Sequence, residues 1–140
     1  MKLSTIPPNA RIVWDPALSP TLSRLRDQSL HPSDVRALIA QITAILAKDA
    51  VIPPSPDEQV AIIVILRSGL AMMESFVSQL PKNADMIICH LGLFREKESL
   101  QPVEYYNKLA PKSPKIKHGY ILDPIIATGG TASAAINILK

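Results

Sequence analysis

The feature that most constrains the fold is a run of seven consecutive apolar residues, Val60 to Leu66. A strand with one face in water alternates apolar and polar side chains, whereas a strand covered on both faces is apolar throughout. Three prolines, Pro53, Pro54 and Pro56, interrupt the chain just before the run. The sequence therefore predicts a strand inside a parallel sheet that is covered on both faces.

A tight polar turn and a helix follow this strand. The turn is Arg67-Ser68-Gly69, and Leu70, Met73 and Val77 then recur at helical spacing. The guanidinium of Arg67 is a fixed cation whose planar donors suit pyrophosphate oxygens. An isolated arginine after a strand is more often an ordinary surface charge, so this interpretation depends on the rest of the chain.

The same order of strand, loop and helix occurs again near residue 120. An apolar strand, Gly119 to Leu122, leads to Asp123, then to Thr128-Gly129-Gly130-Thr131 and a helix over Ala132 to Leu139. Glycines let backbone N–H groups approach an anion, and the start of a helix adds unpaired N–H groups. A carboxylate five residues earlier can accept hydrogen bonds from sugar hydroxyls, which indicates a ribose 5-phosphate. A Gly-Gly turn that joins strand to helix by chance is the alternative.

Three segments together resemble one known family. The run Ile121 to Thr131 resembles the phosphoribosyl-pyrophosphate (PRPP) signature of type I phosphoribosyltransferases, and its Asp-Pro variant resembles the uracil phosphoribosyltransferases in particular. Ile65 to Leu70 is similar to the family's pyrophosphate turn, with Ser68 where alanine is usual. Leu91 to Ser99, followed by Glu104 to Leu109, is similar to a third family segment.

The resemblance implies an enzyme of pyrimidine salvage that transfers ribose 5-phosphate from PRPP to uracil, giving UMP and pyrophosphate. It implies catalytic roles for Arg67, Arg95 and Asp123, and Mg²⁺ held through PRPP and water. The residues that would contact PRPP are Arg67, Arg95, Asp123, Pro124, Ile125, Ile126, Ala127, Thr128, Gly129, Gly130 and Thr131. A non-catalytic PRPP-binding or nucleotide-binding paralogue that regulates a partner is the alternative.

The stretch after Arg95 would be a mobile hairpin that closes over the site, according to the same resemblance. Phe94 and Lys97 depart from the family, which has tyrosine and an acid there. Without the family, Arg95 to Glu98 is a solvated loop of mixed charge.

The alternation of strands and helices predicts an α/β fold with an open, doubly wound parallel sheet. We expect one domain over residues 1–140, with a helix from Pro32 to Lys48, a second strand from Met86 to Leu91 and a short edge strand from Arg11 to Pro16. The family continues past the position of Lys140 with further strands and a base-recognition loop. The resemblance therefore implies a C-terminally truncated domain, inactive alone, in which the strand ending at Leu122 has an unpaired edge. The family also has a β-arm used in subunit contact between the long helix and the first core strand, and Asp49 to Gln59 is too short to form it. A homo-oligomer remains one expectation for this chain.

Composition excludes several other classes. A net charge of +3 suits an anionic substrate, but the cluster Lys112, Lys115, Lys117 and His118 lacks stacking aromatics and indicates a solvated loop rather than a nucleic-acid contact. No apolar span approaches 20 residues, and the start has no signal-peptide pattern, so we expect a cytoplasmic protein without a membrane span. The histidines have no metal-ligand spacing, and the surrounding sequence gives them no general-base partner. Cys89, the single cysteine, is expected to be a buried apolar residue.

Overall fold

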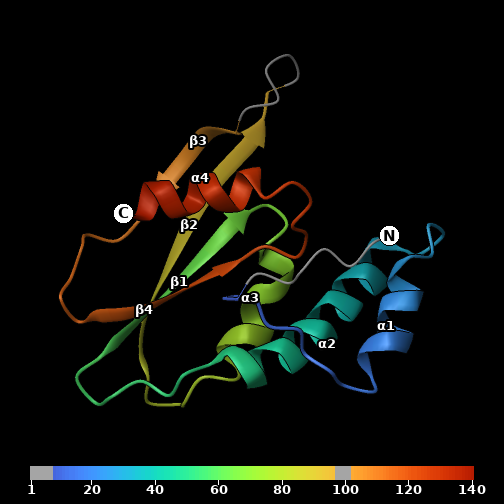
Figure 1. The fold of residues 1–140 in the computed structure, drawn as a ribbon, viewed down its shortest axis with the longest axis horizontal. Coiled ribbons are helices and arrows are strands. Elements are labelled where there is room, and N and C mark those ends of the chain that lie inside the picture. Colours follow the sequence, from blue (N-terminus) through green and yellow to red (C-terminus); the bar gives the residue numbers. More distant parts are fainter. Residues whose placement is uncertain (1–7, 97–101) are drawn as a thin grey trace.

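The computed structural model describes residues 8–96 and 102–140, which form a mixed α/β fold (Figure 1). The elements in chain order are α1 (Leu18–Leu25), α2 (Pro32–Ala50), β1 (Gln59–Leu66), α3 (Leu70–Val77), β2 (Asp85–Arg95), β3 (Pro102–Lys108), β4 (Ile116–Leu122) and α4 (Gly130–Leu139).

The strands form one sheet in the order β3-β2-β1-β4. β1 pairs in parallel with β2 and with β4, whereas β3 pairs antiparallel with β2. The expected α/β fold with a parallel core is therefore confirmed, and the one difference is the antiparallel strand β3 at the edge. Within the described residues β4 pairs only with β1.

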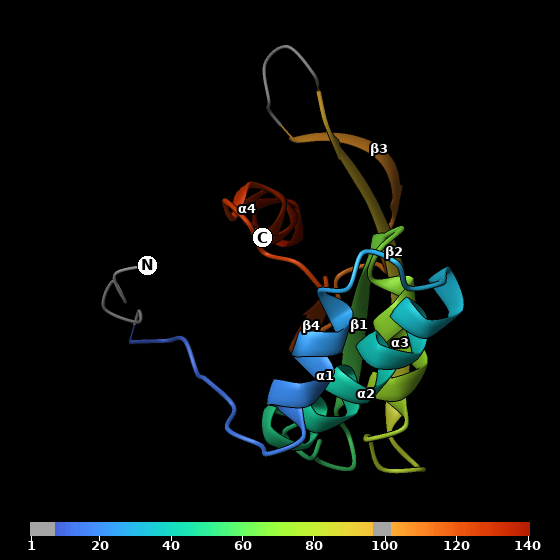
Figure 2. The same ribbon diagram turned by 90° about the vertical axis from the view of Figure 1, so that its right-hand side faces the viewer.

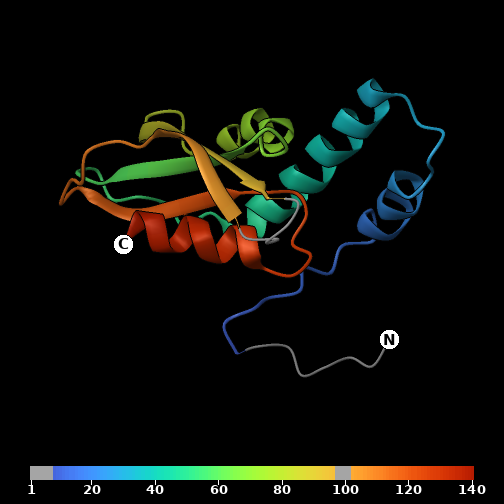
Figure 3. The same cartoon turned by 90° about the horizontal axis from the view of Figure 1, so that it is seen from above.

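The apolar run lies at the centre of the sheet and contributes to two cores. Val60, Ile62 and Val64 pack with Phe76 of α3 on one face. Ala61, Ile63 and Ile65 pack with Cys89 and Ala135 on the other face. Figure 2 shows α4 on one side of the sheet and α2 and α3 on the other, and Figure 3 shows α4 lying along its face. Full burial of one such aliphatic side chain is worth about 1.5–3 kcal/mol, which explains why the run has no polar residue.

Several strand boundaries differ from the predicted ones, because they depend on backbone pairing between distant segments that the sequence does not reveal. The expected edge strand Arg11 to Pro16 is wrong: this segment pairs with no described strand, and Trp14 is 87% exposed. Arg11 instead forms an ion pair with Asp49 of α2 at 2.9 Å. β2 continues to Arg95 because β3 pairs along that extension, and β4 starts at Ile116 because Gln59 offers it a partner.

The helix expected from Pro32 is confirmed as α2. Pro32 occupies its first turn, where a missing N–H costs nothing. In the described part of the chain, no helix has both the length and the apolar composition needed to cross a bilayer.

Candidate functional site

The turn after β1 is held against the end of β4. The Leu66–Arg67 peptide bond is cis, and the N–H of Gly69 donates to the carbonyl of Ile65 at 2.8 Å. A Cβ on Gly69 would lie 2.3 Å from the carbonyl oxygen of Leu122, closer than any real contact. Glycine is therefore required here because two backbone segments touch. The side chains of Arg67 and Ser68 are exposed at this point.

The second predicted loop starts where β4 ends and surrounds a cavity. Asp123 is half-buried, and Gly129, at the N-cap of α4, has a φ of 81° in the left-handed region that glycine tolerates. A cavity of about 350 Å³ is lined by Asp123, Ile125, Ile126, Ala127, Gly129, Thr131 and Ala132. Nothing lies within 4 Å of the position that a Cβ on Gly129 would take, so a ligand can come close to this backbone.

The two loops meet directly. The hydroxyl of Ser68 donates a hydrogen bond to Oδ1 of Asp123 at 3.1 Å. β1 and β4 are parallel neighbours, so their carboxyl ends lie at the same edge of the sheet (Figure 1). The structure therefore brings together the arginine turn and the acidic loop, which are more than fifty residues apart in sequence. Open α/β sheets bind ligands at this kind of edge.

Arg95 lies farther along a neighbouring strand. Leu66 pairs with Gly92, so Arg95 is three residues beyond the last residue of β2 that pairs with β1, a distance of about 10 Å along the strand. Its backbone pairs with Pro102 at the start of the antiparallel strand β3. The side chain of Arg95 and residues 97–101 lie outside the described part, so the contact with PRPP and the closure stay predictions.

No metal cluster is formed within residues 8–96 and 102–140: no three His, Cys, Asp or Glu side chains are grouped in a way that could hold an ion. Half-buried Asp123 contributes a carboxylate to the wall of the cavity. Any hard cation there would depend mainly on ligand oxygens and water, as Mg²⁺ commonly does.

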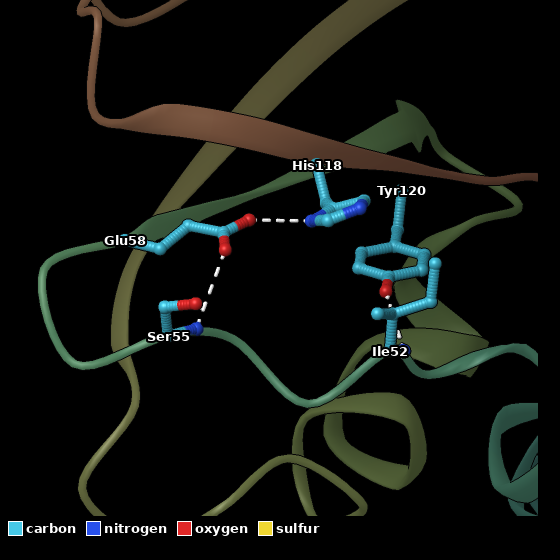
Figure 4. Close-up of polar contacts among 5 residues, drawn as sticks. All are labelled: Ile52, Ser55, Glu58, His118 and Tyr120. Atoms are coloured by element: carbon cyan, nitrogen blue, oxygen red, sulfur yellow. Dashed lines mark hydrogen bonds and ion pairs between the residues drawn. The ribbon is translucent and has the colours of Figure 1, made fainter.

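A second polar cluster lies at the opposite ends of the same two strands (Figure 4). Oε1 of Glu58 accepts a hydrogen bond from Nδ1 of His118, and Oε2 accepts one from the N–H of Ser55 at 3.3 Å. The bond from His118 is the main cause that lowers the pKa of Glu58 below its usual 4.5, although burial opposes it. The hydroxyl of Tyr120 accepts a hydrogen bond from the N–H of Ile52 at 2.9 Å.

Sequence reasoning missed two side-chain hydrogen bonds that join segments at the ends of β1 and β4: Glu58 with His118, and Ser68 with Asp123. It found no partner for His118 in the surrounding sequence, and Glu58, which bonds to it, is 60 residues away. It noted Ser68 only as a replacement for the alanine that is usual in the family, and it did not predict the contact with Asp123. The available signal was the parallel pairing of the two strands: once it is known that Val60 pairs with His118, Glu58 becomes a near neighbour.

Comparison with known proteins gives consistent matches to one family. The family model for uracil phosphoribosyltransferase matches residues 54–140. The urg2 protein of Schizosaccharomyces pombe is 44% identical over 132 residues, which are 94% of this chain and 62% of that protein. The uracil phosphoribosyltransferase of Thermus thermophilus is 33% identical over 147 residues, covering 92% of this chain and 69% of the relative.

A solved structure agrees with the fold. The AQ2163 protein from Aquifex aeolicus superposes with a TM-score of 0.74 at 26% identity, over 90% of this chain and 67% of the other. The chain thus spans roughly two thirds of the length of the proteins it matches, and 62% of the S. pombe relative.

Proposed function

The chain belongs to the uracil phosphoribosyltransferase family, and from that premise we propose that it transfers ribose 5-phosphate from PRPP to uracil, giving UMP and pyrophosphate. The observation that carries this proposal is the contact between the two loops, made by the hydrogen bond from Ser68 to Asp123. A single crevice can then hold the pyrophosphate beside one loop and the 5-phosphate beside the other.

Each loop offers groups suited to one part of PRPP. The exposed guanidinium of Arg67 would bind pyrophosphate oxygens, as planar paired donors do. The carboxylate of Asp123 would accept hydrogen bonds from the ribose hydroxyls. The 5-phosphate would lie in the cavity by Gly129, at the N-terminus of α4, where unpaired N–H groups and the helix dipole favour an anion. Pro124, Ile125 and Ile126 join these two parts of the site.

In the proposed reaction the bond from C1 of the ribose to the pyrophosphate oxygen breaks, and the electron pair leaves with pyrophosphate. A uracil ring nitrogen bonds to C1 and its proton passes to solvent. Arg67 and Arg95 would stabilise the charge on the departing group, and Asp123 would hold the sugar in place while positive charge develops at C1. The protein thus acts by positioning and electrostatics, with no covalent intermediate.

Among the described residues that line the cavity, Asp123 contributes the carboxylate, which fits Mg²⁺ that is held chiefly by PRPP oxygens and water. When bound, the ion would offset part of the negative charge of the pyrophosphate. The chain's own contribution would remain the guanidinium of Arg67 and the donors around Gly129.

The test begins with PRPP binding, measured by calorimetry in the presence of Mg²⁺, and continues with formation of labelled UMP from radiolabelled uracil. We expect Asp123→Asn to weaken PRPP binding about tenfold or more, because hydrogen bonds to a charged group are lost. Asp57→Asn is the control, since Asp57 is an exposed acid before β1, at the far end of the strand. Equal affinity of Asp123→Asn and wild type would refute the ribose role.

A further inference from the structure

The Arg67 turn and Asp123 are joined by one side-chain contact, whose donor is Ser68. The distance from Ser68 Oγ to Asp123 Oδ1 is 3.1 Å. The backbone around Ser68 is itself fixed: the N–H of Ala71 donates to the carbonyl of Ser68 at 3.2 Å, and Gly69 is wedged against Leu122. The hydroxyl that donates to the carboxylate of Asp123 is therefore carried by a backbone segment that is held in place.

The chemistry of this donor leaves the site available to a ligand. An ionised carboxylate has about four lone-pair positions, and a single hydroxyl occupies one of them. The others stay available to sugar hydroxyls. Because a hydroxyl is neutral, it orients the carboxylate without cancelling its charge.

An ion pair between Arg67 and Asp123 would cancel the charge of the carboxylate, and the described part of the structure does not form one. Among the residues that the structure describes, the ion pairs are Arg11–Asp49 and Glu58–His118, so Arg67 does not pair with Asp123. The guanidinium and the carboxylate thus lie on adjoining loops, each still able to bind a different part of one substrate.

We infer that Ser68 is a positioning residue, whose hydroxyl holds the Asp123 carboxylate in the orientation that meets the ribose hydroxyls of PRPP. This inference rests on the proposed function, because the role of Asp123 toward ribose is itself a proposal. It assigns to Ser68 a task that alanine at this position could not perform.

The first experiment uses the free chain and measures amide hydrogen exchange over residues 123–128. Ser68→Ala should speed exchange there, Ser68→Thr should restore the wild-type rate because it keeps a hydroxyl, and Ser78→Ala should have no effect. Ser78 is the control, since its hydroxyl also donates one exposed hydrogen bond, to the carbonyl of Ser75 at 2.8 Å, and accepts another from the side-chain amide of Gln79 at 3.2 Å. Identical exchange in Ser68→Ala and wild type would overturn the inference.

The second experiment measures binding of PRPP with Mg²⁺. Ser68→Ala should bind about threefold to tenfold more weakly, the usual effect of one net hydrogen bond, and Ser68→Thr should bind like wild type. If Ser68 acts through Asp123, Ser68→Ala should add less than about twofold in an Asp123→Ala background, because coupled residues are not additive. A full and additive loss there would mean that Ser68 contacts PRPP itself, which would overturn the positioning role.

The two failures can be told apart. If the wild-type chain does not bind PRPP, the proposed function fails and the inference fails with it. If wild type and Ser68→Ala bind PRPP equally while Asp123→Asn does not, only the inference fails.

Discussion

At each end of the paired strands β1 and β4, a carboxylate accepts a side-chain hydrogen bond from the segment beside it. The two carboxylates, Glu58 and Asp123, differ in burial and in the number of their partners. At the amino ends, Glu58 has two hydrogen-bond partners and its side chain is 10% exposed. At the carboxyl ends, Asp123 has one side-chain partner within the described residues and borders a cavity of about 350 Å³. The carboxylate of Glu58 uses both of its oxygens, one for His118 of β4 and one for Ser55 in the loop before β1. The carboxylate of Asp123 is less fully used, which the proposed binding of ribose hydroxyls requires. The two acids therefore differ in burial and in the number of partners rather than in chemical type.

The largest effect on stability should come from Gly69→Ala, which disrupts the backbone contact between the turn after β1 and the end of β4. The added Cβ would meet backbone atoms of Leu122 and Ile65 at 2.3 to 2.9 Å, and backbone cannot move aside easily. We expect a loss of about 3 kcal/mol in the free energy of unfolding, measured by urea denaturation. Gly119→Ala is the control: its Cβ would meet only the flexible end of Ile63 at 3.4 Å, and it should change stability far less. Equal losses in both variants would show that the two loops are not tightly packed.

A smaller effect is expected from Gly129→Ala, which alters the cavity and leaves the strand contact intact. The φ of 81° is strained for any residue with a Cβ, at a cost of about 1 kcal/mol, although the surrounding space is open. If the cavity binds the 5-phosphate, PRPP affinity should fall by more than this loss of stability explains. Calorimetric titration beside a urea denaturation curve separates the two quantities, and unchanged affinity would exclude the loop from phosphate binding.

The smallest effect should follow Glu58→Gln at the amino end, because the amide oxygen can still accept a hydrogen bond. The pKa of Glu58 is lowered in the folded chain, so ionised Glu58 stabilises the fold above pH 4.5, and this contribution disappears as the pH falls through the lowered pKa. Glu58→Gln should therefore melt below wild type at pH 7, and the two melting temperatures should converge in acid. Asp57→Asn serves as the reference, and a gap that stays constant from pH 7 to pH 3 would contradict this account.

The sequence predicted those features of the fold and of the site that depend on residues close to one another in the chain. The run from Val60 to Leu66 is apolar because both of its faces are covered, so its burial could be inferred from composition alone. The two loops could be located because each follows an apolar strand and precedes a helix. Their meeting at one edge follows from the parallel order of strands, which the same pattern favoured.

The rest depended on pairing between distant segments, which no local pattern records. Lys117 and His118 indicated a solvated loop, yet they belong to β4 because Gln59 and Val60 offer backbone partners. Arg11 to Pro16 has the apolar residues of a strand but pairs with none of the strands that the structure describes, and Trp14 stays in solvent. The bridge from Ser68 to Asp123 required the register of two strands to be known.

The loop beside Asp123 has a consequence for how this protein can vary. Ile125 and Ile126 are 74% and 70% exposed, so their side chains extend into water although both residues border the cavity. Replacing either side chain would therefore cost little in packing, although it would change the wall of the cavity. Replacing Gly129 would cost more, because any residue with a Cβ is strained at a φ of 81°.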